Sequence, residues 1–135
     1  MTVDYSLEAE YSASNVQHIP FVCKSNTQFL MFNDNTYTFE LRNISGFGLV
    51  DSIQVSVANG FPTNFPSIQA VAFDDVSNKF YATDTDTNAV WQINGSSLAF
   101  ESSDVVPGYS YPMGIQVYNA TPPVAFTKSF GNIMW

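Results

Sequence analysis

The sequence has few of the residues that zinc sites, disulfide frameworks and nucleic-acid-binding surfaces need. Its 135 residues include one cysteine, Cys23, and one histidine, His18, so an internal disulfide is excluded and the soft ligands of a zinc site are lacking. Only 12% of the residues are charged, and 4 Lys+Arg against 12 Asp+Glu give a net charge of −8. A chain this acidic can neutralise few phosphates, so we expect it to bind neither nucleic acid nor anionic membranes.

Long apolar runs are also missing, both inside the chain and at its start. No run approaches the roughly 20 residues of a transmembrane helix. The first residues lack the basic start and the apolar stretch of a secretory signal. We therefore expect a chain that is made in the cytosol and not processed, with the virus particle as a candidate location.

What the sequence has in abundance is alternation of apolar and polar residues with a period of two. Clear examples are residues 37–41, 52–57, 89–93 and 114–118. Val, Ile, Phe, Tyr and Thr fill these runs, and clusters of Asn, Asp, Gly and Pro separate them. No long stretch keeps the apolar stripe of a helix. The pattern predicts one all-β domain over residues 1–135, with about ten short strands.

The strand pattern itself repeats along the chain. Residues 80–91 align without a gap with residues 124–135, and each segment ends in tryptophan. An earlier copy begins at Phe29 with one residue fewer in its turn, so that Phe39 takes the place of the tryptophan. Three prolines precede the copies at a constant spacing of 46 residues: Pro20, Pro66 and Pro112. These observations predict three degenerate four-stranded units of about 45 residues: 20–65, 66–111, and 112–135 completed by 1–19.

Four segments of the central unit follow one another in a characteristic order. They are AVAFD at 70–74, SNKFYATD at 77–84, NAVWQI at 88–93 and PMGI at 112–115. This order resembles a blade of the YVTN/NHL-like β-propellers over about residues 66–116. The first unit departs most, because it has no Asn-Lys-Phe-Tyr segment and no glycine after its proline. The resemblance implies a propeller-like fold, and it implies little about activity because blade motifs are structural.

A propeller of three blades would not close, since known rings have four to eight blades. Two copies of the chain would supply six blades, and each N-terminal strand could complete the last blade of its neighbour. We therefore expect self-association, as a homodimer or a larger assembly, which closes the ring. The alternative fold is a β-sandwich or jelly roll in which the strand repetition is accidental.

No catalytic or metal constellation stands out in the sequence. Residues 84–88 have the Asp-x-Asp-x-Asn spacing that opens a calcium loop, but the loop's sixth and twelfth positions hold Ala89 and Gly95 where glycine and glutamate are needed. His18 has no recognisable triad partner, and no Gly-x-Ser-x-Gly elbow is present. We expect no enzymatic activity, no catalytic residue, no cofactor and no metal.

Aromatic residues are the candidates for a ligand site or an interface. Phe39, Trp91 and Trp135 share one repeat position, where an aromatic ring either packs between blades or, in sugar-binding propellers, stacks on a pyranose ring. Four further aromatics lie in the linkers that precede the second and third prolines: Phe61, Phe65, Tyr109 and Tyr111. These linkers share one end of a propeller and could form a recognition surface.

The composition favours a structural role. A small, weakly charged β chain rich in Asn, Thr, Ser and aromatic residues is typical of capsid decoration and tail proteins of viruses and phages. We expect a non-enzymatic structural or assembly protein that contacts other structural proteins or itself. The alternative is an oligomeric β-propeller lectin that binds glycans through its repeated tryptophans. An enzyme would need a polar pocket with perturbed titratable groups, and the sequence suggests none.

Overall fold

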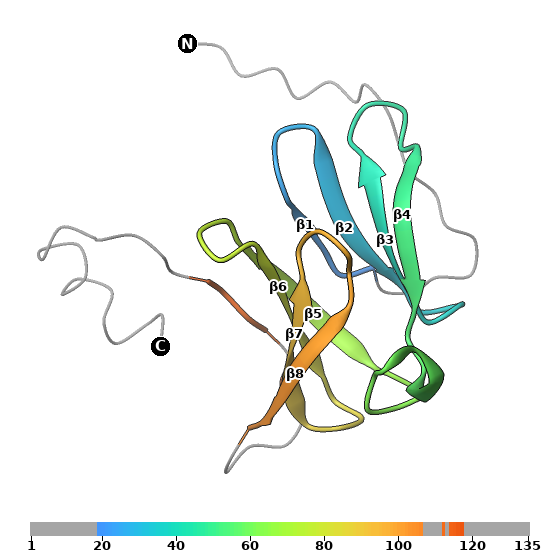
Figure 1. Ribbon diagram of the computed structural model, residues 1–135, viewed down its shortest axis with the longest axis vertical. Coiled ribbons are helices and arrows are strands. Elements are labelled where there is room, and N and C mark those ends of the chain that lie inside the picture. Colours follow the sequence, from blue (N-terminus) through green and yellow to red (C-terminus); the bar gives the residue numbers. More distant parts are fainter. Residues whose placement is uncertain (1–18, 107–111, 113, 118–135) are drawn as a thin grey trace, which may run out of the picture.

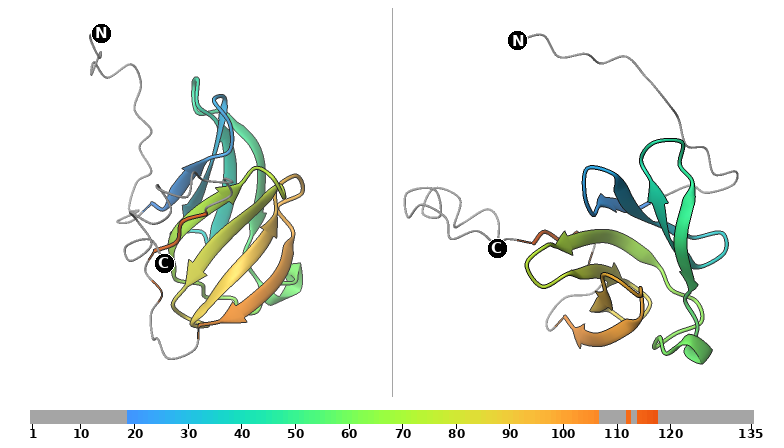
Figure 2. Two further views of the ribbon diagram at one scale, coloured as in Figure 1. Left: turned by 90° about the vertical axis from the view of Figure 1, so that its left-hand side faces the viewer. Right: turned by 45° about the horizontal axis from the view of Figure 1, so that its top comes forward.

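Two antiparallel sheets make up the fold. The computed structural model describes residues 19–106, 112 and 114–117, and the sheets lie against each other as two layers (Figures 1 and 2). The first sheet consists of four strands: β1 (Phe21–Cys23), β2 (Gln28–Asn33), β3 (Thr38–Asn43) and β4 (Leu49–Gln54). The second sheet consists of four more: β5 (Ile68–Asp74), β6 (Lys79–Asp84), β7 (Ala89–Asn94) and β8 (Phe100–Val105). In both sheets each strand pairs with its neighbours in the chain.

The all-β prediction is confirmed, with repeated sheet units. The two sheets fall within the predicted units 20–65 and 66–111, whereas most of the third unit lies outside the described residues. Within the described part of the chain, the only helical segment is the 3-10 turn η1 (Val57–Asn59), which connects the sheets. The strand predicted at 52–57 therefore ends at Gln54, and residues 114–117 of the strand predicted at 114–118 form no strand. No helix in the described segments is long and apolar enough to cross a membrane.

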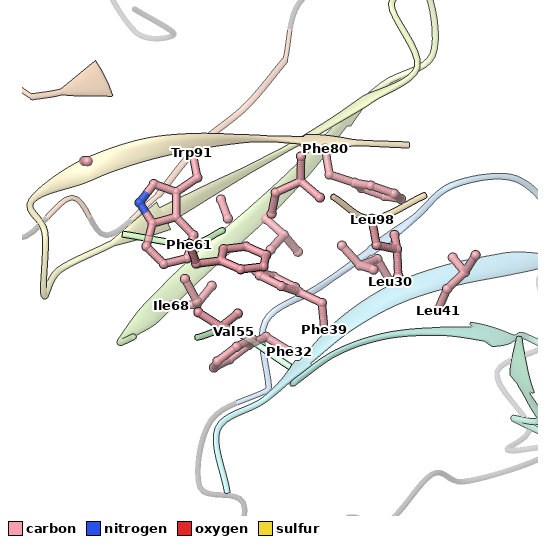
Figure 3. Packing of buried hydrophobic residues seen from close by; sticks show 14 residues of the cluster. Leu30, Phe32, Phe39, Leu41, Val55, Phe61, Ile68, Phe80, Trp91 and Leu98 are labelled. Atoms are coloured by element: carbon pink, nitrogen blue, oxygen red, sulfur yellow. The ribbon is translucent and has the colours of Figure 1, made fainter. Parts of the chain in front are cut away.

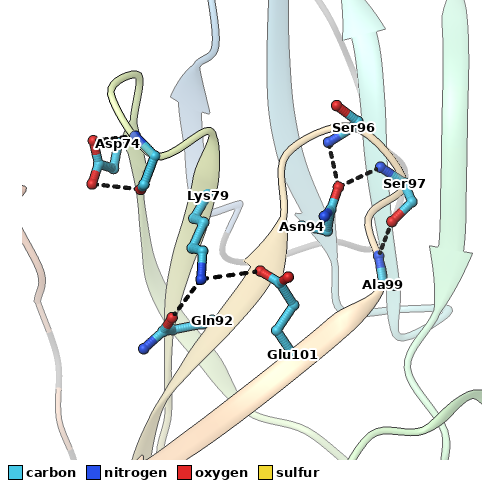
Figure 4. A network of polar contacts seen from close by, with 9 residues as sticks. Asp74, Lys79, Gln92, Asn94, Ser96, Ser97, Ala99 and Glu101 are labelled. Carbon is cyan, nitrogen blue, oxygen red and sulfur yellow. Dashed lines mark hydrogen bonds and ion pairs between the residues drawn. The ribbon is translucent and has the colours of Figure 1, made fainter.

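Asparagine and aspartate side chains close the turns. Asp74 Oδ1 accepts hydrogen bonds from the backbone N–H groups of Val76 and Ser77, at 2.9 and 3.2 Å. Asn94 Oδ1 accepts the same pair of bonds from Ser96 and Ser97, at 2.8 and 2.9 Å (Figure 4). Such local bonds give the backbone an alternative to the sheet ladder and so end a strand. The strands that end in this way do so at Asn33, Asp74, Asp84 and Asn94.

The two sheets repeat with a spacing of 51 residues from their second strand onward. The second, third and fourth strands begin at 28, 38 and 49 in the first sheet and at 79, 89 and 100 in the second. Left-handed turn residues recur at the same spacing, Tyr37 with Asn88 and Phe47 with Leu98. This spacing is longer than the expected 45 residues. By strand register, Phe39 therefore corresponds to Val90 in the second sheet and not to Trp91.

The hydrophobic core lies between the two sheets (Figure 3). Because side chains alternate along a strand, one face of each sheet is almost wholly apolar. The residues that meet there are Leu30, Phe32, Phe39 and Leu41 from the first sheet and Phe80, Ala82, Trp91 and Ile93 from the second. Each of them is at most 4% exposed. A hydrogen bond of 2.7 Å from Lys24 Nζ to the Gly95 carbonyl adds a polar link between the sheets.

The two faces that meet in the core are not equivalent. Leu30 and Phe32 point toward the second sheet, and their counterparts 51 residues later are Tyr81 and Thr83. Those counterparts alternate with Phe80 and Ala82, so they lie on the face turned away from the first sheet. We call the face of the first sheet that carries Leu30 its front face. The front face of the second sheet is the one that carries Tyr81, the counterpart of Leu30. The opposite face of each sheet is its rear face. The front of the first sheet thus packs on the rear of the second.

Candidate functional site

An apolar recess opens on the rear face of the first sheet. Its volume is about 380 Å³, within the range of ligand-binding pockets. The side chains that line it come from the segment before β1, from β1 and β2, and from the turn between β3 and β4: Ile19, Phe21, Cys23, Phe29, Met31, Ile44 and Phe47. The recess faces away from the second sheet, so the core described above does not fill it.

Strand register places the side chains of the inner wall of the recess on one face. Phe21 lies opposite Met31, and Cys23 lies opposite Phe29, so these four side chains stand on one face of the β1–β2 pair. The ring of Phe29 contacts Phe21 and Phe47 edge-on, with centroid distances of 6.4 and 6.2 Å. Met31 is fully buried at the floor, whereas Phe21 is 64% exposed at the rim. The recess therefore has a buried floor and an apolar rim that water still reaches.

An ion pair beside the recess fixes the β3–β4 turn, which forms the outer wall of the recess. Arg42 Nη1 donates a hydrogen bond of 2.8 Å to the Phe47 carbonyl, and Arg42 Nε donates one of 2.8 Å to Glu40 Oε1. Glu40 also accepts a bond of 3.2 Å from Asn33 Nδ2. These bonds fix the turn in which Phe47 adopts a left-handed conformation, with φ at 58°. The polar groups are thus engaged with one another, and the lining side chains are apolar apart from the weakly polar Cys23 thiol.

Two of the three aromatic residues predicted from the repeat, Phe39 and Trp91, lie in the core. Trp91 and Phe39 are fully buried, and Phe61 from the connection between the sheets packs beside both, with ring centroids 5.6 and 6.3 Å away (Figure 3). Trp91 Nε1 donates a hydrogen bond of 3.2 Å to Thr87 Oγ1. In the folded chain these rings have no free face for a sugar.

The other predicted aromatics are placed differently. Phe65 is 69% exposed, and its ring lies 6.1 Å from that of Tyr37, away from the recess. Tyr109, Tyr111 and Trp135 lie outside the described residues. Of the four predicted aromatics that the structure describes, Phe65 is thus exposed, whereas Phe39, Phe61 and Trp91 lie in the core.

Residues 84–88, which have the spacing that opens a calcium loop, form a turn. Asp84 is fully buried, and its oxygens accept short bonds from Ser67 N at 2.7 Å, Thr87 N at 2.8 Å and Thr87 Oγ1 at 2.6 Å. The carboxylate thus closes the β6–β7 turn and ties it to the start of β5. Among the described residues, no group of three or more His, Cys, Asp or Glu side chains could hold a metal ion.

The recess was not predicted from the sequence, although one signal for it is present. Residues 29–32, FLMF, form a continuous apolar run, and such a run indicates a strand that is covered on both faces. The second apolar face of β2 is the wall of the recess.

Comparisons with known proteins show a likeness in fold. No family model matches the chain, and no curated protein sequence matches it. The structure of apo AztD from Citrobacter koseri aligns with a TM-score of 0.56 and 18% identity, over 76% of this chain and 26% of that one. A second structure of AztD from the same organism aligns with a TM-score of 0.59 and 18% identity, over 82% of this chain and 29% of that one. The chain thus spans less than a third of the length of AztD, and at this identity the likeness shows a shared β-rich fold.

Proposed function

We propose that the chain is a non-enzymatic structural or assembly protein, of the kind found in virus and phage particles, that acts through protein–protein contacts. The observation that carries this proposal is the recess on the rear face of the first sheet. Soluble monomers rarely leave a contiguous apolar surface open, and where they do it marks a contact site.

The chemistry of the recess favours a protein partner over a small substrate or a sugar. Sites for small molecules combine apolar walls with a few convergent polar groups that orient the ligand. Here the neighbouring Arg42 donates hydrogen bonds to Glu40 and to the Phe47 carbonyl. The lectin alternative gains no support from Trp91, which is fully buried.

The proposal includes the architecture. The two sheets are taken as neighbouring blades of a propeller-like array of three degenerate units, whose ring closes by oligomerisation. The 51-residue repeat, the sequential strand order and the likeness to AztD support this arrangement.

Alkylation of Cys23 tests the assembly function. Cys23 is the chain's one cysteine, it lines the recess and it is exposed, so its alkylation rate reports whether the recess is covered. We expect slow alkylation in a native extract of the source and fast alkylation in the purified chain at high dilution. A matched control moves the thiol to an exposed turn, in the double variant Cys23→Ser/Val76→Cys, because Val76 is 78% exposed. The control thiol should react equally fast in both samples, and equal rates for Cys23 itself would refute the proposed function.

A further inference from the structure

We propose that Phe47 is a gate of the recess, which swings outward on Gly46 and Gly48 to admit the apolar part of the partner. This inference rests on the proposed assembly function and describes how its site opens. The β3–β4 turn, which carries Phe47, and the β7–β8 turn have matching backbone bonds, but side chains hold them differently.

The two turns are copies of one backbone conformation, 51 residues apart. Phe47 and Leu98 take the same place in them, and both are left-handed, with φ at 58° and 62°. One backbone hydrogen bond closes each turn at matching positions, from Asn43 N to the Gly48 carbonyl at 2.9 Å and from Asn94 N to the Ala99 carbonyl at 2.8 Å. A difference in how firmly the turns are held therefore comes from their side chains.

Side chains lock the β7–β8 turn. Asn94 Oδ1 accepts bonds from Ser96 N and Ser97 N, at 2.8 and 2.9 Å. Asn78 Nδ2 donates a bond of 2.9 Å to Ser96 Oγ, which ties the turn to its neighbour. Leu98 is fully buried between the sheets, so it cannot leave its place without opening the core.

The β3–β4 turn lacks these locks. Within the part of the chain that the structure describes, the side chain of Asn43 makes no hydrogen bond to the turn ahead of it. Glycines replace Ser97 and Ala99, so Phe47 stands between Gly46 and Gly48. A Cβ at Gly46 would meet no atom within 4 Å, so the turn is surrounded by open space. Phe47 itself is only half-buried.

Arg42 keeps the gate closed. Its Nη1 donates a bond of 2.8 Å to the Phe47 carbonyl, and its Nε donates one of 2.8 Å to Glu40, which fixes the guanidinium. A left-handed conformation is strained for a residue with a side chain, so the backbone of Phe47 gains by leaving it once the Arg42 bond breaks. Glycine on both sides lets Phe47 turn without displacing β3 or β4.

Opening the gate changes the recess directly. The ring of Phe47 lies 6.2 Å from that of Phe29, and both line the recess of about 380 Å³. When Phe47 turns outward, the recess widens toward the β3–β4 turn. The apparent affinity of an occupant that needs the wider recess is then scaled by the fraction of molecules whose gate is open.

Amide hydrogen exchange of the full chain, followed by NMR at low concentration, tests the gate. Rotation at Gly48 displaces the carbonyl that accepts the bond from Asn43 N, so the Asn43 amide reports opening. We expect it to exchange at least about 10-fold faster than its counterpart Asn94, after correction for intrinsic rates.

Ile44 is the control within the same turn. Its amide donates a bond of 2.9 Å to the Thr27 carbonyl, which does not depend on the gate. The counterpart of this bond, from Gly95 N to the Asn78 carbonyl, is also 2.9 Å long. Ile44 and Gly95 should therefore exchange at similar rates, whereas general loosening of the first sheet would speed Ile44 as much as Asn43.

Two variants move the gate in opposite directions. The double variant Glu40→Gln/Arg42→Met removes the bond to the Phe47 carbonyl without leaving a buried charge unpaired, since Glu40 is 7% exposed. It should speed exchange at Asn43 at least about 5-fold. Gly48→Ala stiffens one hinge, and its Cβ meets only Asn43 Nδ2 at 3.7 Å, so it should slow this exchange about 2–5-fold. If the double variant does not fold, Gly48→Ala alone decides.

Nile red, a neutral apolar dye, tests whether the gate serves the recess. Its affinity, measured by fluorescence titration, should rise at least about 3-fold in the double variant and fall about 2–5-fold in Gly48→Ala. Phe21→Asp should abolish this binding, because Phe21 lines the recess. Phe65→Asp is its matched control, since Phe65 is 69% exposed against 64% for Phe21 but lies away from the recess.

The outcomes distinguish the gate from the function on which it rests. Equal exchange rates of Asn43 and Asn94, equal rates of Asn43 and Ile44, or a dye affinity that neither variant changes would overturn the gate. If Cys23 is nevertheless protected in the native extract, the assembly function stands with a recess that does not open. If Cys23 is unprotected while the exchange and dye results are as expected, the gate stands and the assembly function fails.

Discussion

Replacement of Gly95 by alanine should destabilise the second sheet strongly. A Cβ at this position would lie 2.3 Å from Asn78 Oδ1 and 2.5 Å from the Asn78 carbonyl oxygen. The carbonyl cannot simply rotate away, because it accepts a hydrogen bond of 2.9 Å from Gly95 N. Overpacking costs about 1–3 kcal/mol, and loss of the bond adds about 0.5–1.5 kcal/mol. We therefore expect the free energy of unfolding to fall by about 2–4 kcal/mol.

Urea unfolding followed by circular dichroism measures this change. It should be done at low chain concentration, since self-association would add stability. Gly48→Ala is the matched control, because a Cβ there would meet only Asn43 Nδ2, at an ordinary 3.7 Å. The control should stay within about 0.5 kcal/mol of the unmodified chain. If Gly95→Ala is as stable as Gly48→Ala, the close packing of the Asn78 turn on Gly95 is not what requires glycine.

Two further substitutions test the core and the turns. Trp91→Ala should lower the free energy of unfolding by about 3–5 kcal/mol, because it removes a fully buried ring. Urea titration checks this, and a folded variant of unchanged stability would contradict a core role for Trp91. Asp84→Asn should cost about 2 kcal/mol, since an amide nitrogen would face groups that donate to the carboxylate, including Thr87 N and Thr87 Oγ1. The same titration measures it, and a neutral effect would show that the carboxylate does not hold the β6–β7 turn.

The strands could be predicted because their signal is local. The run predicted at 89–93 is β7 (Ala89–Asn94), where alternation and the flanking Asn residues agree. The prediction at 52–57 ran too far for an equally local reason. Val55 continues the alternation, but Ser56 accepts a hydrogen bond of 3.2 Å from Asn59 N and turns the chain into η1. Alternation of apolar and polar residues alone does not reveal such a cap.

The recess could not be predicted, because it depends on how the sheets pack. Both faces of β2 are apolar, with Leu30 and Phe32 on one and Phe29 and Met31 on the other. The sequence of the strand does not say which face meets the second sheet. The same limit affected Trp91, since a repeated aromatic is compatible with a core and with a sugar platform until its neighbours are known.

The sequential strand order of both sheets has a consequence for folding kinetics. Every strand pairs with a neighbour in the chain, so each sheet can form by closing short loops, which is fast. Docking of the two sheets joins residues that lie farther apart in the sequence than the paired strands do. Phe61, in the connecting segment, packs between Phe39 and Trp91. We expect truncation of Phe61 to speed unfolding more than it slows folding, because its contacts form after the hairpins are in place.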